Sequence, residues 1–207
     1  RALGAEVRRA GRVWDDARDA ALALAAAEGL TFVHPFADPD VVAGAGTLGL
    51  EVVADLPDVD AVLVGVGGGG LLAGVAVAVR GLRPGARVIG VEPVGAPTLH
   101  GSLAAGAIVA VDEIRTVAGS LAPRRTEPLV FDLVRRLVER VVLVTDDDLR
   151  AAARWLWDEL AIGAELGGSA AVAALLTGAY APAPGEKVVA VVCGAGTDGW
   201  NAGAIGT

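Results

Sequence analysis

Short apolar runs alternate with longer amphipathic segments along most of the chain. Apolar runs rich in valine are typical of strands, and apolar positions that recur every three or four residues are typical of helices. The pattern predicts strands at residues 5–10, 31–34, 61–66, 87–93, 141–145 and 187–194. It predicts helices at residues 14–29, 38–56, 71–82, 127–140, 145–161 and 169–180, with a less regular segment at 95–125. This alternation favours an α/β fold, in which helices flank a parallel sheet.

Two of the predicted helices carry clear end signals. Asp15 and Asp16 fall in the first turn of one helix, where negative charge is favourable, and Gly29 marks its end. Thr145 and Asp148 have the spacing of a capping box at the start of another. Five residues of that second helix share one face and are predicted to be buried: Leu149, Ala152, Ala153, Leu156 and Leu160.

Glycine interrupts two otherwise regular segments. The predicted helix 38–56 contains Gly44, Gly46 and Gly49, whose small size would let a neighbouring element approach closely. Residues 67–70 are four consecutive glycines between an apolar strand and an apolar helix. A tight turn with positive φ rarely needs four glycines. A strand, a glycine loop and a helix N-terminus instead predict a phosphate-binding loop, because consecutive amides and the helix dipole favour an anion.

Composition limits the class of protein. The chain has 207 residues, of which 54% are hydrophobic and 20% charged, so it can form a packed core. A net charge of −8 argues against a nucleic-acid partner. The single cysteine, Cys193, excludes an internal disulfide and fits a reducing cytoplasm. Residues 61–79 are uncharged and long enough to span a bilayer, but the glycines in their middle favour a strand, loop and helix.

The glycine loop also satisfies the spacing of a dinucleotide-binding site. Gly65, Gly67 and Gly70 form the pattern G-x-G-x-x-G, and Glu92 ends the next predicted strand, where an acid could bind a ribose hydroxyl. This interpretation predicts a Rossmann-type NAD(P)-dependent oxidoreductase. A further alternative is a non-catalytic module that binds a phosphate ligand.

Six segments, taken together, resemble a known family. They are "ALGAEV", "EGLTFVHPFADPDVVAGAGTLGLEV", "PDVDAVLVGVGGGGLLAG", "VIGVEPVGAPTL", "AELGGSAAVAAL" and "VVCGAGTD". In this order they resemble the fold-type II pyridoxal-phosphate enzymes of the tryptophan synthase β family, closest to the threonine/serine dehydratases, with serine racemase a near relative. The resemblance implies a tryptophan synthase β-like fold, pyridoxal 5'-phosphate as cofactor, and a cytoplasmic homodimer. The implied reaction is dehydration and deamination of L-threonine or L-serine to a 2-oxo acid plus ammonia.

The resemblance also implies roles for individual residues. Cys193 matches the position whose side chain faces the pyridine nitrogen, and Glu165 and Ser120 match positions beside the ring. From the residues alone, Cys193 could instead be a buried, inert thiol, and Glu165 a helix N-terminal acid. The amides that would hold the cofactor phosphate belong to Gly67, Gly68, Gly69, Gly70 and Leu71.

The chain departs from the family pattern near the implied site. In relatives with a divalent-ion site, Glu92 and the Ala96 carbonyl match two ligands, but the second acid is replaced by Thr98. Since hard cations need several oxygen ligands, we expect no metal site, and Glu92 could be a solvated acid at a strand end. Polar groups are also lost where the family has glutamine, asparagine and aspartate: at Ala45, at Gly196 and in the loop at Gly119.

The family's Schiff-base lysine has no counterpart in this sequence. Lys187 is the only lysine, and six residues of strand, about 20 Å, separate it from Cys193. Lys187 therefore cannot reach the cofactor aldehyde while Cys193 faces its ring nitrogen. Because the sequence starts at Arg1 and contains no methionine, we expect a C-terminal portion of a longer protein. Residues 1–38 would be the remainder of a small domain and 39–207 a large cofactor-binding domain, with an exposed sheet edge, weak cofactor binding and no activity alone.

Overall fold

The computed structural model describes residues 3–11 and 13–196, and the contacts within it divide the chain into two units at His34 and Pro35. The sequence analysis places its domain boundary at 38/39. Arg1 and the last two residues of the motif "VVCGAGTD", Thr197 and Asp198, lie outside the described residues.

The first unit contains one helix, α1 (Trp14–Glu28), in the part that the structure describes. Its end is as predicted, because Gly29 adopts the left-handed conformation with φ of 67°. The strands predicted at 5–10 and 31–34 are wrong, since both segments are irregular. A strand is stabilised by pairing with another strand, and neither segment has a pairing partner among the described residues.

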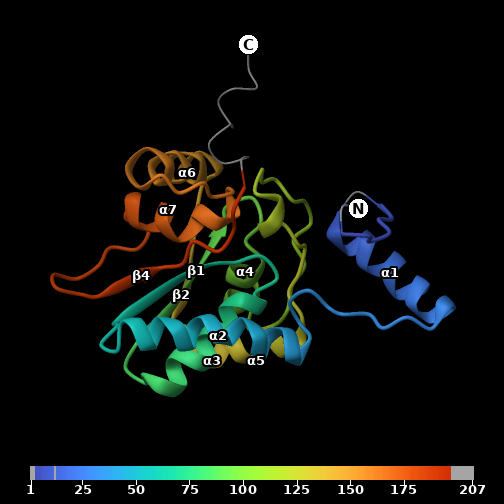
Figure 1. Cartoon of the computed structure of the whole chain (residues 1–207), viewed down its shortest axis with the longest axis horizontal. Helices are drawn as coiled ribbons and strands as arrows, with labels where there is room; N and C mark the ends of the chain where they lie inside the picture. The colour runs from blue at the N-terminus through green and yellow to red at the C-terminus, as the bar shows by residue number, and fades with distance from the viewer. Residues whose placement is uncertain (1–2, 12, 197–207) are drawn as a thin grey trace, which may run out of the picture. The chain divides into compact units, whose positions relative to one another are not determined.

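The second unit is built on a four-stranded parallel sheet (Figure 1), which confirms the predicted fold class. The strand order is β3-β2-β1-β4. The chain adds β2 and β3 on one side of β1 and then adds β4 on the other side, so the order of strand addition reverses at β1. In the described part of the chain β4 pairs only with β1, which leaves it as an edge strand. The strands are β1 (Ala61–Gly65), β2 (Arg87–Pro93), β3 (Arg140–Val144) and β4 (Val188–Ala190).

Helices cover both faces of this sheet (Figure 1). On one face α3 packs against the sheet and α2 and α5 pack against α3, and on the opposite face lies a second core with α6 and α7. Successive residues of β1 face the two cores in turn, with Leu63 in one and Val62 and Val64 in the other. This explains why the strand is apolar without alternation. The helices are α2 (Pro39–Asp55), α3 (Gly70–Leu82), α4 (Thr98–Ala105), α5 (Pro128–Leu137), α6 (Asp146–Leu160) and α7 (Ala170–Leu176).

Helices α2 and α3 approach each other through glycines. A Cβ atom on Gly74 of α3 would lie 2.7 Å from the Gly46 nitrogen of α2, and one on Gly49 would lie 2.9 Å from the Val75 carbonyl oxygen. The prediction that Gly46 and Gly49 allow a close neighbour is confirmed. It is wrong for Gly44, where a Cβ atom would meet nothing within 4 Å.

Several boundaries differ from the prediction for reasons that lie outside the local sequence. α4 forms within the segment predicted to be irregular, and its N-terminal amides are bound by Glu92 of β2. In α6 the Thr145 hydroxyl accepts the Asp148 N–H as predicted, but Leu160 is 53% exposed and does not belong to the buried face. None of the helices in residues 3–11 and 13–196 combines the length and apolar character needed to cross a bilayer.

Candidate functional site

The glycine loop connects β1 to α3 and presents free amides. The first helical hydrogen bond of α3 runs from the Ala73 N–H to the Gly69 carbonyl, at 2.9 Å. The amides of Gly70, Leu71 and Leu72 therefore have no acceptor within the helix, as is general for a first turn. Such a helix start attracts anions, because its N–H groups and its dipole both favour negative charge.

All four glycines of the loop are needed for space, and for three of them this is the only reason that the structure shows. A Cβ atom on Gly67 would lie 2.7 Å from the Ser120 carbonyl oxygen. One on Gly70 would lie 2.7 Å from Phe36 Cα, and one on Gly68 would lie closer than 3.0 Å to the Phe36 ring. The sequence analysis assigned the glycines to close approach of a ligand, and the structure shows that segments of the chain itself make this approach.

Gly69 must be a glycine for two reasons, its positive φ and the lack of space for a side chain. Its φ of 94° lies in the left-handed region, and a Cβ atom would meet the side chains of Leu99 and Val130 at 2.7 Å. Within the loop, positive φ is confined to this position. The four glycines are therefore surrounded on one side by the segments that carry Phe36, Ser120, Leu99 and Val130.

Cys193 and Glu165 lie at the same edge of the sheet as this loop. The Val191 N–H donates to the Leu63 carbonyl at 3.0 Å, so Cys193 follows just beyond the paired end of β4, beside the end of β1. The Glu165 N–H donates to the Gly194 carbonyl at 3.1 Å, next to Cys193. Ligands of open α/β sheets bind at the carboxyl edge where the strand order reverses, which here is the junction of β1 and β4.

Ser120 contacts both the glycine loop and Glu165. Its hydroxyl donates to Glu165 Oε1 at 2.8 Å, while its carbonyl oxygen faces Gly67. The Glu165 carboxylate is thus bound by a side chain from another segment. Its carbonyl oxygen also accepts the Ser169 N–H at 3.1 Å, so Glu165 precedes the short helix Gly167–Ser169 that α7 continues, as the helix-acid interpretation expects. The residues predicted to bind the phosphate and those predicted to lie beside the ring therefore gather at one edge.

Cys193 is an exposed free cysteine, so the interpretation that its side chain is buried is wrong. Neighbouring atoms restrict hydration of the thiol group and raise its pKa above 9.0, and the negative charge of Glu165 adds to this increase. The thiol is therefore neutral at physiological pH. A neutral group could face a ring nitrogen without adding charge.

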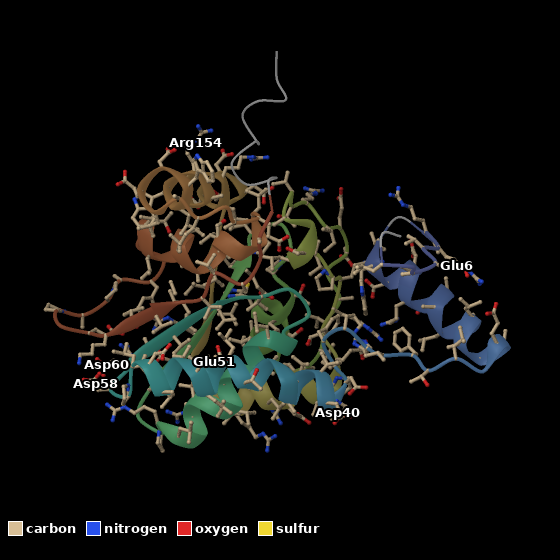
Figure 2. The ribbon with its side chains drawn as sticks, in the orientation of Figure 1. Glu6, Asp40, Glu51, Asp58, Asp60 and Arg154 are labelled. Carbon is tan, nitrogen blue, oxygen red and sulfur yellow. The ribbon has the colours of Figure 1, made fainter. Side chains whose placement is uncertain are left out.

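Lys187 lies at the opposite edge of the sheet. It immediately precedes β4, and its main-chain N–H donates to Asp60 Oδ2 at 2.9 Å. Its ammonium group forms an ion pair with Asp58. Asp58 and Asp60 lie together at this amino edge (Figure 2), away from the carboxyl ends of the strands.

Glu92 is fully buried, so the interpretation as a solvated strand-end acid is wrong. Its Oε1 accepts the Leu99 N–H at 2.7 Å and its Oε2 accepts the His100 N–H at 2.9 Å, both from the first turn of α4. Burial raises the pKa of this carboxyl group to about 8, against the lowering effect of the two amides. Because both oxygens bind α4, Glu92 is not free to bind a ribose, and the Rossmann interpretation loses its acid.

The weak metal candidates do not form a cluster. The Ala96 carbonyl accepts the Thr98 N–H at 2.9 Å, and the Thr98 hydroxyl donates to the Pro123 carbonyl at 2.9 Å. Among the described residues no group of three or more His, Cys, Asp or Glu side chains could hold a metal ion.

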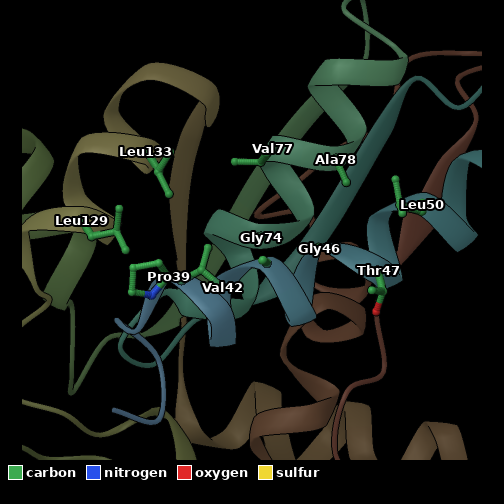
Figure 3. A pocket seen from close by; sticks show the side chains of 11 residues that line it. Pro39, Val42, Gly46, Thr47, Leu50, Gly74, Val77, Ala78, Leu129 and Leu133 are labelled. Carbon is green, nitrogen blue, oxygen red and sulfur yellow. The ribbon is translucent and has the colours of Figure 1, made fainter. Parts of the chain in front are cut away.

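An apolar pocket of about 380 Å³ lies elsewhere, between α2, α3 and α5 (Figure 3). No charged side chain lines it, and it contains none of the predicted site residues. Its lining includes Pro39, Val42 and Leu50 of α2, Gly74 and Val77 of α3, and Leu133 of α5.

Comparison with known proteins identifies the family. A model described as "Pyridoxal-phosphate dependent enzyme" matches residues 1–194. The chain belongs to the pyridoxal-phosphate dependent enzyme family. This membership and the parallel sheet confirm the fold-type II, tryptophan synthase β-like fold that the resemblance implied.

Individual members of this family match nearly the whole chain. The L-threonine ammonia-lyase of Thermotoga maritima is 40% identical over 198 residues, which cover 96% of this chain and 49% of that protein. The processed form of threonine deaminase isoform 2 from Solanum lycopersicum has a TM-score of 0.88 at 36% identity, covering 95% of this chain and 58% of that one. Maize serine racemase also has a TM-score of 0.88, at 26% identity, covering 94% of this chain and 61% of that one. The chain thus spans about half the length of the curated relative it matches.

The sequence analysis missed two residues that contact the glycine loop. The ring of Phe36 packs on the glycine loop, and the Thr126 hydroxyl donates to the Gly68 carbonyl at 2.9 Å. Phe36 lies inside one of the six segments that resemble the family, so the resemblance could have indicated it. Thr126 had none, because it is 58 residues from Gly68 in sequence.

Proposed function

We propose that this chain supplies the cofactor-binding part of an enzyme that eliminates the hydroxyl group of L-threonine or L-serine, releasing a 2-oxo acid and ammonia. The carrying observation is the joint position of the free loop amides, the Ser120–Glu165 pair and Cys193 at one sheet edge. The 40% identity to an L-threonine ammonia-lyase supports the substrate class.

The residues present fit pyridoxal phosphate. The free amides of Gly70 and Leu71 suit a phosphate dianion, and a ligand can approach the loop because Gly67 and Leu71 are partly exposed. The Cys193 thiol, which is neutral and exposed, suits a pyridine nitrogen. When bound, pyridoxal phosphate acts as an electron sink for the negative charge that proton removal leaves on the substrate α-carbon.

In this proposal the chain's own groups bind and orient the cofactor. The loop amides hold the phosphate, Cys193 faces the ring nitrogen, and Ser120 holds the Glu165 carboxylate in place beside the ring. The proton-transferring lysine comes from outside this sequence, because Lys187 is bound to Asp58 at the far edge. We further propose that residues 1–38 belong to a small domain and 39–207 to a large domain of a cytoplasmic homodimer. The unpaired Cys193 is compatible with that location.

Cofactor binding by the purified chain tests the proposal. We expect pyridoxal phosphate to bind without a covalent link to the site, and pyridoxal, which lacks the phosphate, to bind about tenfold more weakly or worse. Treatment with borohydride should leave no site-specific adduct, and Lys187→Ala should bind as the parent chain does. A covalent adduct that depends on Lys187 and saturates with the binding curve would contradict the assignment of the lysine to another segment.

The reaction itself is tested in the enzyme that joins these residues to a Schiff-base lysine. We expect L-threonine and L-serine to yield a 2-oxo acid and ammonia in equal amounts. Racemised serine without ammonia would show a racemase instead.

Cys193 provides a test of where the ring binds. Because its pKa is raised, alkylation by iodoacetamide should be slow at pH 7 and should accelerate as the pH rises above 9. Bound pyridoxal phosphate should slow this alkylation severalfold, as measured by mass spectrometry of Cys193 over time, whereas inorganic phosphate should not. Equal alkylation rates with and without saturating cofactor would place the ring elsewhere.

A further inference from the structure

We infer that Thr126 is a positioning residue of the phosphate loop: its hydroxyl fixes the peptide between Gly68 and Gly69, so that the Gly69 N–H is presented to the anion. This inference rests on the proposed function, because the anion is the cofactor phosphate. Thr126 is 1% exposed, and its hydroxyl donates to the Gly68 carbonyl at 2.9 Å.

The direction of the Gly69 N–H follows from that hydrogen bond. No cis peptide bond occurs in the described residues, and in a trans peptide the carbonyl and the N–H point in opposite directions. The Gly68 carbonyl points to Thr126, so the Gly69 N–H points away from it. Gly69 is buried, and no protein acceptor for its N–H lies among the described residues. Buried amides without a partner are rare, so this donor is suited to a ligand.

A glycine–glycine peptide needs such an external hold. Glycine adopts positive and negative φ with similar ease, so no side chain prevents this peptide from turning over. The loop glycines are required for space, since Phe36, Ser120, Leu99 and Val130 crowd them, and that requirement leaves the peptide without steric bias. The Thr126 hydroxyl supplies the missing preference before the ligand arrives. Donors held in place in advance bind charge better than donors that must reorient.

The surroundings of Thr126 support this role. It lies in an irregular stretch between the short helix Gly119–Leu121 and α5, where no sheet or helix ladder fixes the backbone. Val130, in the first turn of α5, packs against Gly69 from the same stretch of chain. Residues 126–130 thus hold the peptide by the Thr126 hydrogen bond at Gly68 and by a Val130 methyl group at Gly69.

Three variants of the full chain test the inference. Thr126→Val removes the hydroxyl at nearly constant volume, and Thr126→Ser keeps it. Thr98→Val is the matched control, because Thr98 is also 1% exposed and also donates to a carbonyl at 2.9 Å, that of Pro123. We measure the binding of inorganic phosphate, pyridoxal phosphate and pyridoxal, together with the midpoint of thermal unfolding.

We expect Thr126→Val to weaken the binding of inorganic phosphate and pyridoxal phosphate by about tenfold, the size expected for one lost hydrogen bond to a charged group. Pyridoxal binding should be unchanged. Thr126→Ser should bind as the parent chain does, and Thr98→Val should lower the unfolding midpoint without weakening phosphate binding. The inference would be overturned if Thr126→Val lost equal affinity for phosphate and for pyridoxal. It would also be overturned if Thr98→Val lost as much affinity for phosphate as Thr126→Val does.

Amide chemical shifts of the parent chain give a test that does not depend on the folding of any variant. Inorganic phosphate should shift the Gly69 amide resonance together with those of Gly70 and Leu71. Shifts of Gly70 and Leu71 without Gly69 would overturn the role of Thr126 while leaving the proposed function intact. A parent chain that binds neither phosphate nor pyridoxal phosphate would overturn the proposed function itself.

Discussion

Replacing Gly74 with alanine is expected to lower the free energy of unfolding by about 3 kcal/mol, a large effect for a single added methyl group. The Cβ atom would lie 2.7 Å from the Gly46 nitrogen and 3.0 Å from the Ala45 carbonyl carbon, both main-chain atoms of α2. Main-chain atoms within a helix cannot rotate away, so α2 and α3 would have to separate. Denaturation by urea, followed by circular dichroism, measures the loss.

The same helix offers a matched control. Gly81 also lies in α3, and a Cβ atom there would meet nothing within 4 Å. Gly81→Ala should therefore be neutral or stabilise the chain by up to about 1 kcal/mol, because alanine favours the helix. If Gly74→Ala and Gly81→Ala unfold at the same urea concentration, the close contact between α2 and α3 is wrong.

The chain is expected to lose stability as the pH rises from about 4.5 to 8, because of Glu92. Its pKa is about 8 in the folded chain and near the ordinary value of 4.5 when unfolded. Between these values the folded chain holds a proton that the unfolded chain has released, so each added pH unit costs about 1.4 kcal/mol. Above pH 8 both states are ionised and this contribution no longer changes.

Glu92→Gln isolates this effect. Glutamine carries no charge and can still accept a hydrogen bond from one of the two α4 amides. The free energy of unfolding of this variant should therefore change much less between pH 4.5 and 8 than that of the parent chain. Glu51→Gln changes an exposed acid on α2 (Figure 2) and should keep the parent slope. Urea denaturation at pH 5, 6, 7 and 8 at constant ionic strength compares the three. Parallel slopes for the parent chain and Glu92→Gln would show that Glu92 ionises normally.

Local sequence patterns predicted the central sheet but not the elements whose stability depends on distant residues. β1 and β2 were found because buried parallel strands are continuous apolar runs, and β3 is a similar valine-rich run although it lies at an edge of the sheet. α4 was missed because its N-terminal amides are bound by Glu92, seven and eight residues earlier on a different element. The apolar runs at 5–10 and 31–34 have the right composition for strands, but composition does not supply a pairing partner.

For the site, the sequence predicted the glycine loop and a role for Glu165, but not the contacts that the chain itself makes there. The four glycines follow one predicted strand and Cys193 lies at the end of another, and the carboxyl ends of parallel strands share one edge of the sheet. The pairing of Ser120 with Glu165 spans 45 residues, and no local pattern contains it. Likewise, Thr126 is an ordinary threonine in the sequence, and only the folded chain brings its hydroxyl to Gly68.

The crowding of the glycine loop has a genetic consequence. At Gly68 the obstacle to a larger residue is the Phe36 ring, whereas at Gly70 it is the Phe36 main chain. A smaller residue at position 36 should therefore suppress the defect of Gly68→Ala but never that of Gly70→Ala. At Gly67 the obstacle is the Ser120 carbonyl, which no substitution removes. Second-site suppressors should thus be recoverable for Gly68 and absent for Gly67 and Gly70, although all three glycines belong to one loop.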